Sequence, residues 1–152
     1  MSVTPAPLVP LPPLLIVEDN EDHLELTREA LVEAGVQNAI DTADTVKAAV
    51  SYLHGCKTTD AKSACFPCVI LLDIRLPDGS GMEVLRATRQ DPDLRMIPVV
   101  MLTSSADTPD IEKAYLLGAN SYLVKPVAFD DFSAKIQEAG LYWAVLNQPC
   151  VR

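Results

Sequence analysis

The stretch from Val69 to Gly79 constrains the fold more than any other. A bulky apolar run, Val69–Leu72, is followed at once by Asp73 and then by turn residues at Pro77–Gly79. A short apolar run that ends in turn residues is typical of a strand buried on both faces, as in parallel sheets. Asp73 would then lie at the carboxyl end of a central strand, where open α/β folds place their ligands. An aspartate that only initiates the turn is the simpler alternative.

Strand and helix patterns alternate along the rest of the chain. Apolar strands are predicted at 14–17, 69–72, 98–102 and 121–124, and a weaker one at 37–41. Helices with apolar residues every three or four positions are predicted after Asn20, Asp44, Ser80, Thr108 and Phe129, with Asp44 as a cap. Alternation of this kind builds a doubly wound α/β fold, here with a five-stranded parallel sheet.

Length and composition favour one soluble, cytoplasmic domain. A chain of 152 residues matches an ordinary domain, and no apolar run is long enough to cross a bilayer. The net charge of −9, without a cluster of Lys and Arg, argues against binding to nucleic acid or to anionic membranes. The proline-rich residues 1–13 do not resemble a secretory signal and predict a disordered tail.

An exposed loop is predicted from His54 to Pro67, since this segment has no apolar period. His54, Cys56, Cys65 and Cys68 could supply four zinc ligands, but their spacing lacks the paired-knuckle pattern of structural zinc sites. Ordinary small apolar side chains are the favoured interpretation of these cysteines.

The C-terminal segment predicts one helix with a break or bend near Gly140. Before this point the apolar residues lie on one face, whereas beyond it the other faces become apolar as well. A terminal helix that is apolar all round normally needs another surface, so we expect a dimer interface, with packing on the same domain as the alternative. The candidate interface residues are Leu141, Tyr142, Trp143, Val145 and Leu146.

Four of the predicted strands end in polar groups, and the ends of parallel strands share one edge of the sheet. These groups are Glu18 with Asp19, Asp73, Thr103 and Lys125. Converging carboxylates repel one another unless a cation is present, and Mg²⁺ suits such oxygen ligands. A carboxylate can also attack phosphorus to give an aspartyl phosphate, a reaction that needs Mg²⁺ and a positive charge.

At these residues the sequence resembles the receiver domains of two-component response regulators, from Leu14 to Glu138. The matching motifs are Leu14–Asn20, Leu71–Pro77 with Gly79, Met101–Ser104 and Tyr122–Pro126. The resemblance implies the flavodoxin-like strand order 2-1-3-4-5. We therefore predict a receiver domain at 14–139 and a C-terminal helical extension at 140–152.

The resemblance also implies a role for each residue of the predicted site. Asp73 is the expected phosphoacceptor, with Mg²⁺ or Mn²⁺ bound by Asp73, directly by Asp19, through water by Glu18 and by the backbone carbonyl of Arg75. Lys125 and Thr103 would stabilise the phosphoryl group, and Thr103 with Tyr122 would form the switch pair. Arg75 and Ser105 occupy positions that tune access of hydrolytic water. The Lys125–Pro126 bond would be cis by resemblance, whereas the sequence alone favours trans.

The expected function is that of a phosphoacceptor that catalyses only its own phosphorylation and dephosphorylation. The resemblance implies a histidine kinase as partner. The long loop, the expected absence of an output domain and the aromatic extension resemble regulators paired with bacterial phytochromes. A homodimer is expected through the fourth helix, fifth strand and fifth helix together with the extension.

Three alternatives belong to other classes of protein. A haloacid-dehalogenase phosphatase also uses an Asp nucleophile but needs a second acid two residues later, where this chain has Arg75. A flavodoxin-like cofactor binder needs a phosphate-cradling loop, where Glu18 and Asp19 would repel phosphate. A receiver-shaped module that is never phosphorylated is the third.

Overall fold

The computed structural model describes residues 11–57, 66–126 and 128–147. The predicted tail at 1–13 therefore lies almost wholly outside the described residues, as do Cys65, Cys150 and the side chain of Phe129. In the described part of the chain, no helix is long and apolar enough to span a membrane.

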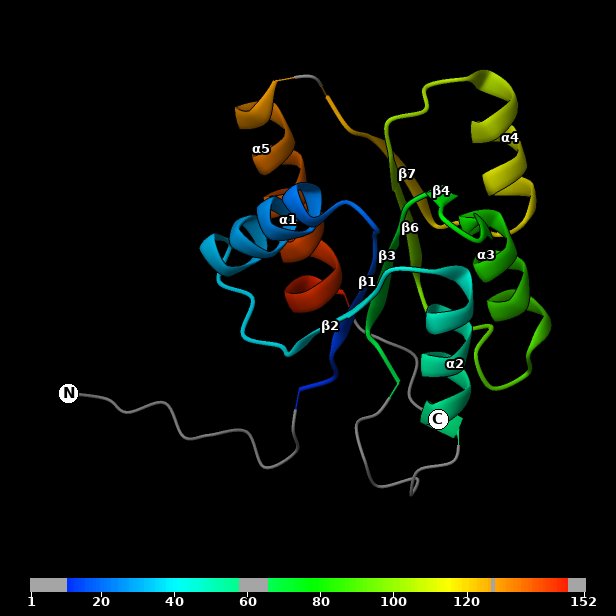
Figure 1. The fold of residues 1–152 in the computed structure, drawn as a ribbon. Helices are drawn as coiled ribbons and strands as arrows, with labels where there is room; N and C mark the ends of the chain where they lie inside the picture. Colours follow the sequence, from blue (N-terminus) through cyan, green and yellow to red (C-terminus); the bar gives the residue numbers. More distant parts are fainter. Residues whose placement is uncertain (1–10, 58–65, 127, 148–152) are drawn as a thin grey trace.

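A five-stranded parallel sheet forms the centre of the molecule, with the order β2-β1-β3-β6-β7. This order confirms the predicted doubly wound topology (Figure 1). The strands are β1 (Leu14–Val17), β2 (Ile40–Ala43), β3 (Val69–Leu72), β6 (Val99–Thr103) and β7 (Ser121–Val124). The weakly patterned edge strand lies three residues beyond its predicted start.

Five α-helices cover the two faces of the sheet. They are α1 (Glu21–Glu33), α2 (Val46–Lys57), α3 (Gly81–Gln90), α4 (Thr108–Leu116) and α5 (Phe129–Gly140). Helices α1 and α5 lie together on one face, and α2, α3 and α4 lie on the other (Figure 1). The arrangement is a three-layer α/β/α sandwich.

Each face of the sheet has its own apolar core, because successive side chains of a strand point to opposite faces. Leu15 and Val17 of β1 belong to the core under α2, α3 and α4, whereas Leu14 and Ile16 belong to the core under α1 and α5. Every residue of β1 and β3 is buried, as expected for central strands of a parallel sheet. The backbone at the carboxyl ends of these strands is therefore held from both sides.

The prediction of a loop from His54 to Pro67 is wrong for its first residues, since α2 continues through Lys57. Its buried residues, Ala49, Leu53 and Cys56, extend the helical period into the segment assigned to the loop. Residues 58–65 lie outside the described part of the chain.

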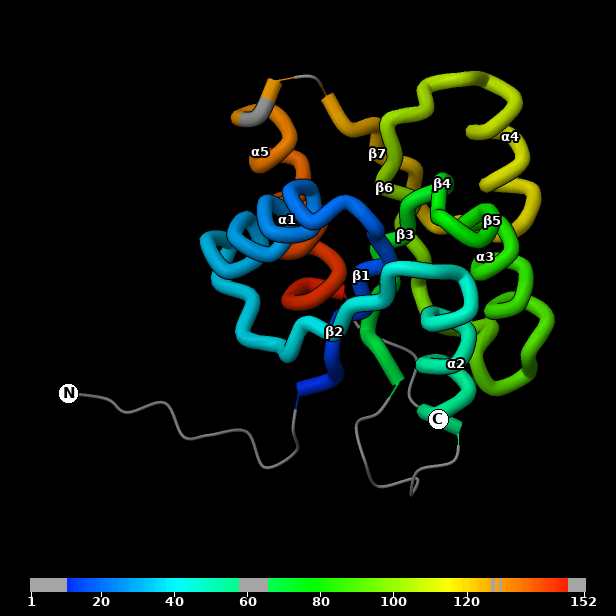
Figure 2. Tube along the Cα trace, viewed as in Figure 1, coloured from blue at the N-terminus to red at the C-terminus, as the bar shows by residue number. Residues whose placement is uncertain are grey.

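The start of α2 is capped by residues other than the predicted Asp44. The Thr45 hydroxyl accepts a hydrogen bond from the backbone N–H of Ala48 at 2.9 Å. The carboxylate of Asp78, more than 30 residues away in sequence, accepts from Val46 and Lys47 at 2.7 and 3.0 Å. A short hairpin that the sequence did not predict, β4 (Arg75–Leu76) with β5 (Gly79–Ser80), holds Asp78 at its turn (Figure 2).

The C-terminal segment does not break at Gly140. Helix α5 continues directly into a π-helix, η1 (Leu141–Leu146), with helical backbone angles at Gly140 and Leu141. A Cβ at Gly140 would lie 2.4 Å from Leu31 Cδ2, so the glycine lets α5 approach α1 closely.

All peptide bonds between described residues are trans, and this includes Lys125–Pro126.

Gly81, the first residue of α3, packs directly against the backbone that carries Asp73. A Cβ there would lie 1.9 Å from the carbonyl oxygen of Asp73, and the Gly81 N–H donates to the carbonyl of Ile74 at 2.6 Å. We predict that Gly81→Ala lowers the free energy of unfolding by about 1–3 kcal/mol, because backbone has to move to admit the methyl group.

Gly55→Ala is the matched control for this denaturation experiment, since a Cβ at Gly55 in α2 meets nothing within 4 Å. It should raise the free energy of unfolding by up to about 1 kcal/mol, because alanine favours a helix over glycine. Equal denaturation midpoints for the two variants would contradict the close approach at Gly81.

Candidate functional site

The carboxyl ends of β1, β3, β6 and β7 lie along one edge of the sheet, because these strands are parallel. The edge gathers the polar residues that follow or end the four strands, as predicted. They are Glu18, Asp19, Asp73, Thr103 and Lys125.

The ammonium group of Lys125 is the centre of this site. Its Nζ lies 3.1 Å from Asp73 Oδ2 and forms a second hydrogen-bonded ion pair with Glu18 Oε1. The side chains of Lys125 and Glu18 are 6% and 5% exposed. Removing one member of a buried ion pair leaves an uncompensated charge and typically costs about 3–5 kcal/mol. The three groups therefore depend on one another.

Burial is the largest influence on the pKa of both carboxyl groups. It raises the pKa of Glu18 to about 7, with Asp73 acting in the same direction and Lys125 opposing. Burial also acts to raise the pKa of Asp73, but its interactions with Glu18, with the positive charge and N–H groups of Lys125 and with Thr103 outweigh burial and hold this pKa below its ordinary value. The pKa of Asp73 is thus held below that of Glu18, which favours the ionised carboxylate that acts as a nucleophile.

Three carboxylates at this edge fit a divalent cation. Glu18, Asp19 and Asp73 each offer an oxygen, and these oxygens all lie within 4.8 Å of one another. Glu18 Oε2 is buried and has no hydrogen-bond partner among the described residues, which is costly for a carboxylate oxygen. A cleft of about 350 Å³ opens beside Glu18 and Asp19, between α1 and β2. Hard cations such as Mg²⁺ prefer this ligand set and keep part of their water shell.

The two predicted switch residues lie on neighbouring strands, and each is hydrogen-bonded to the backbone of Ser105 in the loop that follows β6. Thr103 ends β6 and is buried. The Tyr122 hydroxyl, from β7, donates to the backbone carbonyl of Ser105 at 2.8 Å. The Ser105 hydroxyl itself donates to Asp110 Oδ2 in α4 at 2.5 Å. The hydroxyl groups of Tyr122 and Ser105 therefore both form hydrogen bonds on the α4 side of the site.

Arg75 lies at the rim, in β4. Its backbone N–H is 3.4 Å from Asp73 Oδ1, and the residue is exposed. The general acid that a haloacid-dehalogenase phosphatase places two residues after its nucleophile therefore has no counterpart at this rim position.

Two residues near the site were missed by the sequence analysis. Gly81 supports the Asp73 backbone, and His23 Nδ1 lies 3.1 Å from Lys125 Nζ. Burial, followed by the charge of Lys125, lowers the pKa of His23. The sequence did give a signal for His23, which lies three residues after the helix cap Asn20, because the first turn of a helix that follows a strand faces the end of that strand. For Gly81 the sequence carried no comparable signal.

The candidate zinc ligands do not form a described site. Cys56 and Cys68 are buried, and burial raises the pKa of Cys68 to about 11, which disfavours the thiolate that binds zinc. Cys65 lies outside the described residues, so the four-ligand arrangement stays a prediction.

The candidate interface residues lie on η1, apart from the acidic cluster. Trp143 packs partly against the core under α1 and α5. Leu141, Tyr142, Val145 and Leu146 are exposed.

Comparison with known proteins agrees with the geometry. The family model of the response regulator receiver domain matches residues 14–137. The probable methanogenesis regulatory protein FilR2 of Methanothrix harundinacea is 37% identical over 89% of this chain and 85% of its own. The response regulator Rcp1 of Synechocystis is 33% identical over 86% of this chain and 87% of its own.

Solved structures give the same result. The Mn²⁺-bound form of Rcp1 has a TM-score of 0.80 at 29% identity and covers 91% of this chain and 99% of its own. The phosphorylated cyanobacterial phytochrome response regulator RcpA has a TM-score of 0.81 at 29% identity, and the match covers 91% of this chain and 98% of RcpA. The bacteriophytochrome response regulator RtBRR has a TM-score of 0.69 at 43% identity, and the match covers 92% of this chain and 84% of RtBRR. The chain belongs to the response regulator receiver domain family.

Proposed function

We propose that this response regulator accepts a phosphoryl group on Asp73 from a histidine kinase. The observation that carries the proposal is the buried ammonium group of Lys125, which lies 3.1 Å from the Asp73 carboxylate in a cluster with two further acids. As the oxygen of Asp73 bonds to phosphorus, the bond from phosphorus to its donor breaks and the donor leaves with the electron pair. Lys125 and Thr103 then donate hydrogen bonds to the phosphoryl oxygens.

A divalent ion completes this site in the proposal. Asp19 and Asp73 would bind Mg²⁺ or Mn²⁺ directly, Glu18 through water, and Arg75 through its backbone carbonyl. The unpartnered Glu18 Oε2 and the clustered acids support this assignment, as does the Mn²⁺-bound form of the relative Rcp1. The ion would neutralise charge that develops on the transferred group.

Phosphorylation would switch the α4, β7 and α5 face through Thr103 and Tyr122. The transferred group adds roughly −1.5 to −2 charge, and a Thr103 hydroxyl that turns toward it leaves space for the Tyr122 ring. Tyr122 would then give up its 2.8 Å hydrogen bond to the Ser105 carbonyl. One or two new charge-assisted hydrogen bonds of about 1.5–3 kcal/mol each suffice to move a balanced equilibrium. Arg75 and Ser105 would set the lifetime of the phosphorylated state.

The proposal that the partner kinase is a phytochrome rests on the names of the relatives. RcpA is named as a cyanobacterial phytochrome response regulator and RtBRR as a bacteriophytochrome response regulator, which supports a phytochrome kinase as partner, whereas FilR2 is named for another process. The protein would act as a signalling phosphoacceptor rather than as an enzyme with a separate substrate. Its cytoplasmic location stays a prediction.

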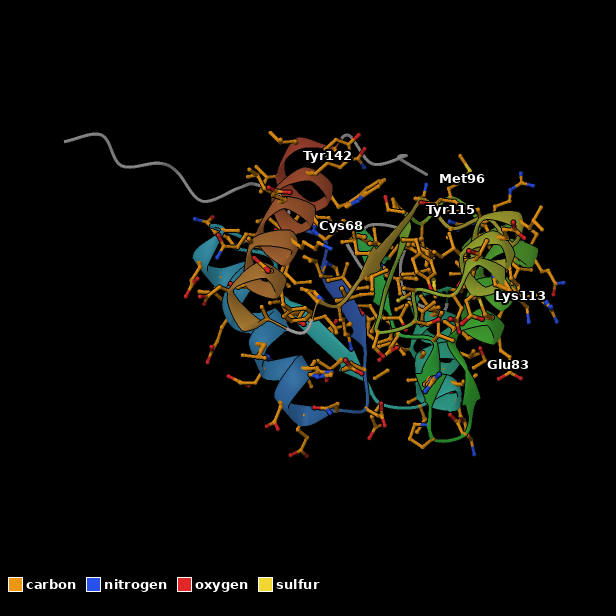
Figure 3. All side chains as sticks on the ribbon, turned by 90° about the horizontal axis from the view of Figure 1, so that it is seen from above. Cys68, Glu83, Met96, Lys113, Tyr115 and Tyr142 are labelled. Carbon is orange, nitrogen blue, oxygen red and sulfur yellow. The ribbon has the colours of Figure 1, made fainter. Side chains whose placement is uncertain are left out.

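A homodimer through the α4, β7 and α5 face and η1 is also part of the proposal. Four exposed apolar side chains of η1 and two of α4, Tyr115 and Leu116, support it. Figure 3 shows Tyr142 on the C-terminal segment and Tyr115 on α4, at opposite sides of the sheet. Trp143 contacts the core of its own chain, so its role would be to hold η1 in place.

The phosphoacceptor role predicts a phosphoryl mass gain with acetyl phosphate and Mg²⁺. In this reaction acetate leaves as the Asp73 acyl phosphate forms. Asp73→Asn should abolish the gain, and Asp93→Asn, which changes an acid of a surface ion pair with Lys57, should retain it. Absence of the gain from the wild type, measured by intact-protein mass spectrometry, would contradict the proposal.

The metal assignment predicts that Asp19→Asn weakens Mg²⁺ binding at least about tenfold, or about 1.4 kcal/mol. The carboxylate is a charged direct ligand in the proposal, and the neutral amide is a poorer one. Isothermal titration calorimetry of the wild type, Asp19→Asn and Asp44→Asn measures the effect. Asp44 lines the same cleft but lies outside the three-carboxylate cluster, so its variant should bind Mg²⁺ within about threefold of wild type. Equal losses in both variants would indicate a general charge effect instead.

The dimer predicts that Leu146→Ser raises the dimer dissociation constant about tenfold, because Leu146 is 66% exposed on η1 and would be buried between the subunits. Val32→Ser is the matched control, since Val32 is 62% exposed on α1, outside the proposed face. Point substitution is sharper than ending the chain at Ala139, which also removes the core contact of Trp143. Sedimentation velocity that finds monomers at micromolar concentration, with and without phosphorylation, would rule out the dimer.

A further inference from the structure

The backbone of His23 is fixed at both of its polar groups. Its N–H donates to the side chain of the helix cap Asn20 at 3.0 Å, and its carbonyl accepts from the Thr27 hydroxyl at 2.7 Å. The residue therefore has a defined place in the first turn of α1, directly after the strand end that carries Glu18 and Asp19.

The imidazole ring of His23 lies between α5 and the site. Its centroid is 6.3 Å from that of Phe132, a buried residue of α5, within the usual range for an aromatic pair. Nδ1 is 3.1 Å from Lys125 Nζ. Because an ammonium group can only donate, Nδ1 is the acceptor and the ring proton is on Nε2.

An ammonium group has three N–H donors, and Lys125 has three acceptors around it. They are Glu18 Oε1, Asp73 Oδ2 and His23 Nδ1. Two of these acceptors take part in the proposed reaction, since Asp73 becomes phosphorylated and Glu18 would bind the metal through water. His23 is the acceptor whose chemistry the reaction leaves unchanged.

We infer that His23 is a positioning residue for phosphoryl transfer, which holds the ammonium group of Lys125 beside Asp73 through its Nδ1. The inference rests on the proposed phosphoacceptor function and assigns a role to a residue of α1 outside the acidic cluster. The ring is held in turn by Phe132, so the placement of Lys125 depends on the contact between α1 and α5.

The test compares His23→Leu with His23→Asn. Leucine keeps an apolar contact with Phe132 but has no acceptor, whereas the asparagine side chain can place an oxygen at the same distance from Cβ as Nδ1. Glu21→Gln, in the exposed first turn of α1, is the control for a change of charge and polarity near the site. All variants are made in the full chain, and their denaturation midpoints are measured first.

The readouts are the rate constant of Asp73 phosphorylation by acetyl phosphate at saturating Mg²⁺ and, separately, the Mg²⁺ dissociation constant. His23→Leu should slow phosphorylation roughly fivefold, the effect of about 1 kcal/mol, while the Mg²⁺ dissociation constant stays within about twofold. His23→Asn and Glu21→Gln should both phosphorylate within about twofold of the wild type.

Two results would overturn the inference alone. Wild-type rates for His23→Leu would show that Lys125 needs no acceptor from α1. Equal slowing in His23→Leu and His23→Asn would assign the effect to the shape of the ring against Phe132. A wild-type protein that takes no phosphoryl group would overturn the proposed function together with the inference.

Discussion

The buried positive charge of Lys125 is the constraint on which the rest of the site depends. An ammonium group with 6% of its side chain exposed needs acceptors from the protein, and it finds them after β1, after β3 and in α1. Lys125 follows the edge strand β7, so its side chain has to cross the end of β6 to reach β3. Neighbouring strands lie about 5 Å apart, so β3 is about 10 Å from β7, and the four-carbon stem of Lys125 and the side chain of Asp73 bridge this distance together. The short side chain of Thr103 at the end of β6 leaves the path open.

The same edge of the sheet is supported by contacts from both faces. On one face, Gly81 of α3 packs against the Asp73 backbone, and the hairpin between Asp73 and Gly81 brings Asp78 to the start of α2. On the other, His23 connects the site with Phe132 of α5. Tyr122 and Ser105 connect it with α4. A change of charge at Asp73 thus has contacts that lead to both α4 and α5, the two helices of the proposed signalling face.

Sequence patterns predicted the parts of the molecule that depend on local chemistry. Fully apolar runs located β1 and β3, and the polar residue after each run located the site, because parallel strands end at one edge. The weak pattern near Ile40 gave an inaccurate edge strand, and the helical period of α2 continued into a segment that polar residues made look like a loop. What escaped prediction depends on tertiary contacts. The cap supplied by Asp78 and the acceptor His23 join segments far apart in the chain, and the close approach at Gly81 depends on how the hairpin brings α3 back against Asp73. Only the place of His23 after the helix cap Asn20 had a local signal.

We propose that phosphoryl transfer at this sheet edge takes place at one carboxylate, that of Asp73. Borohydride reduction of the protein after incubation with acetyl phosphate and Mg²⁺ converts an aspartyl phosphate to homoserine, and peptide mass spectrometry then locates the altered residue. We expect homoserine at position 73 and unaltered acids at positions 18 and 19. Homoserine at any other position, with Asp73 unaltered, would contradict it.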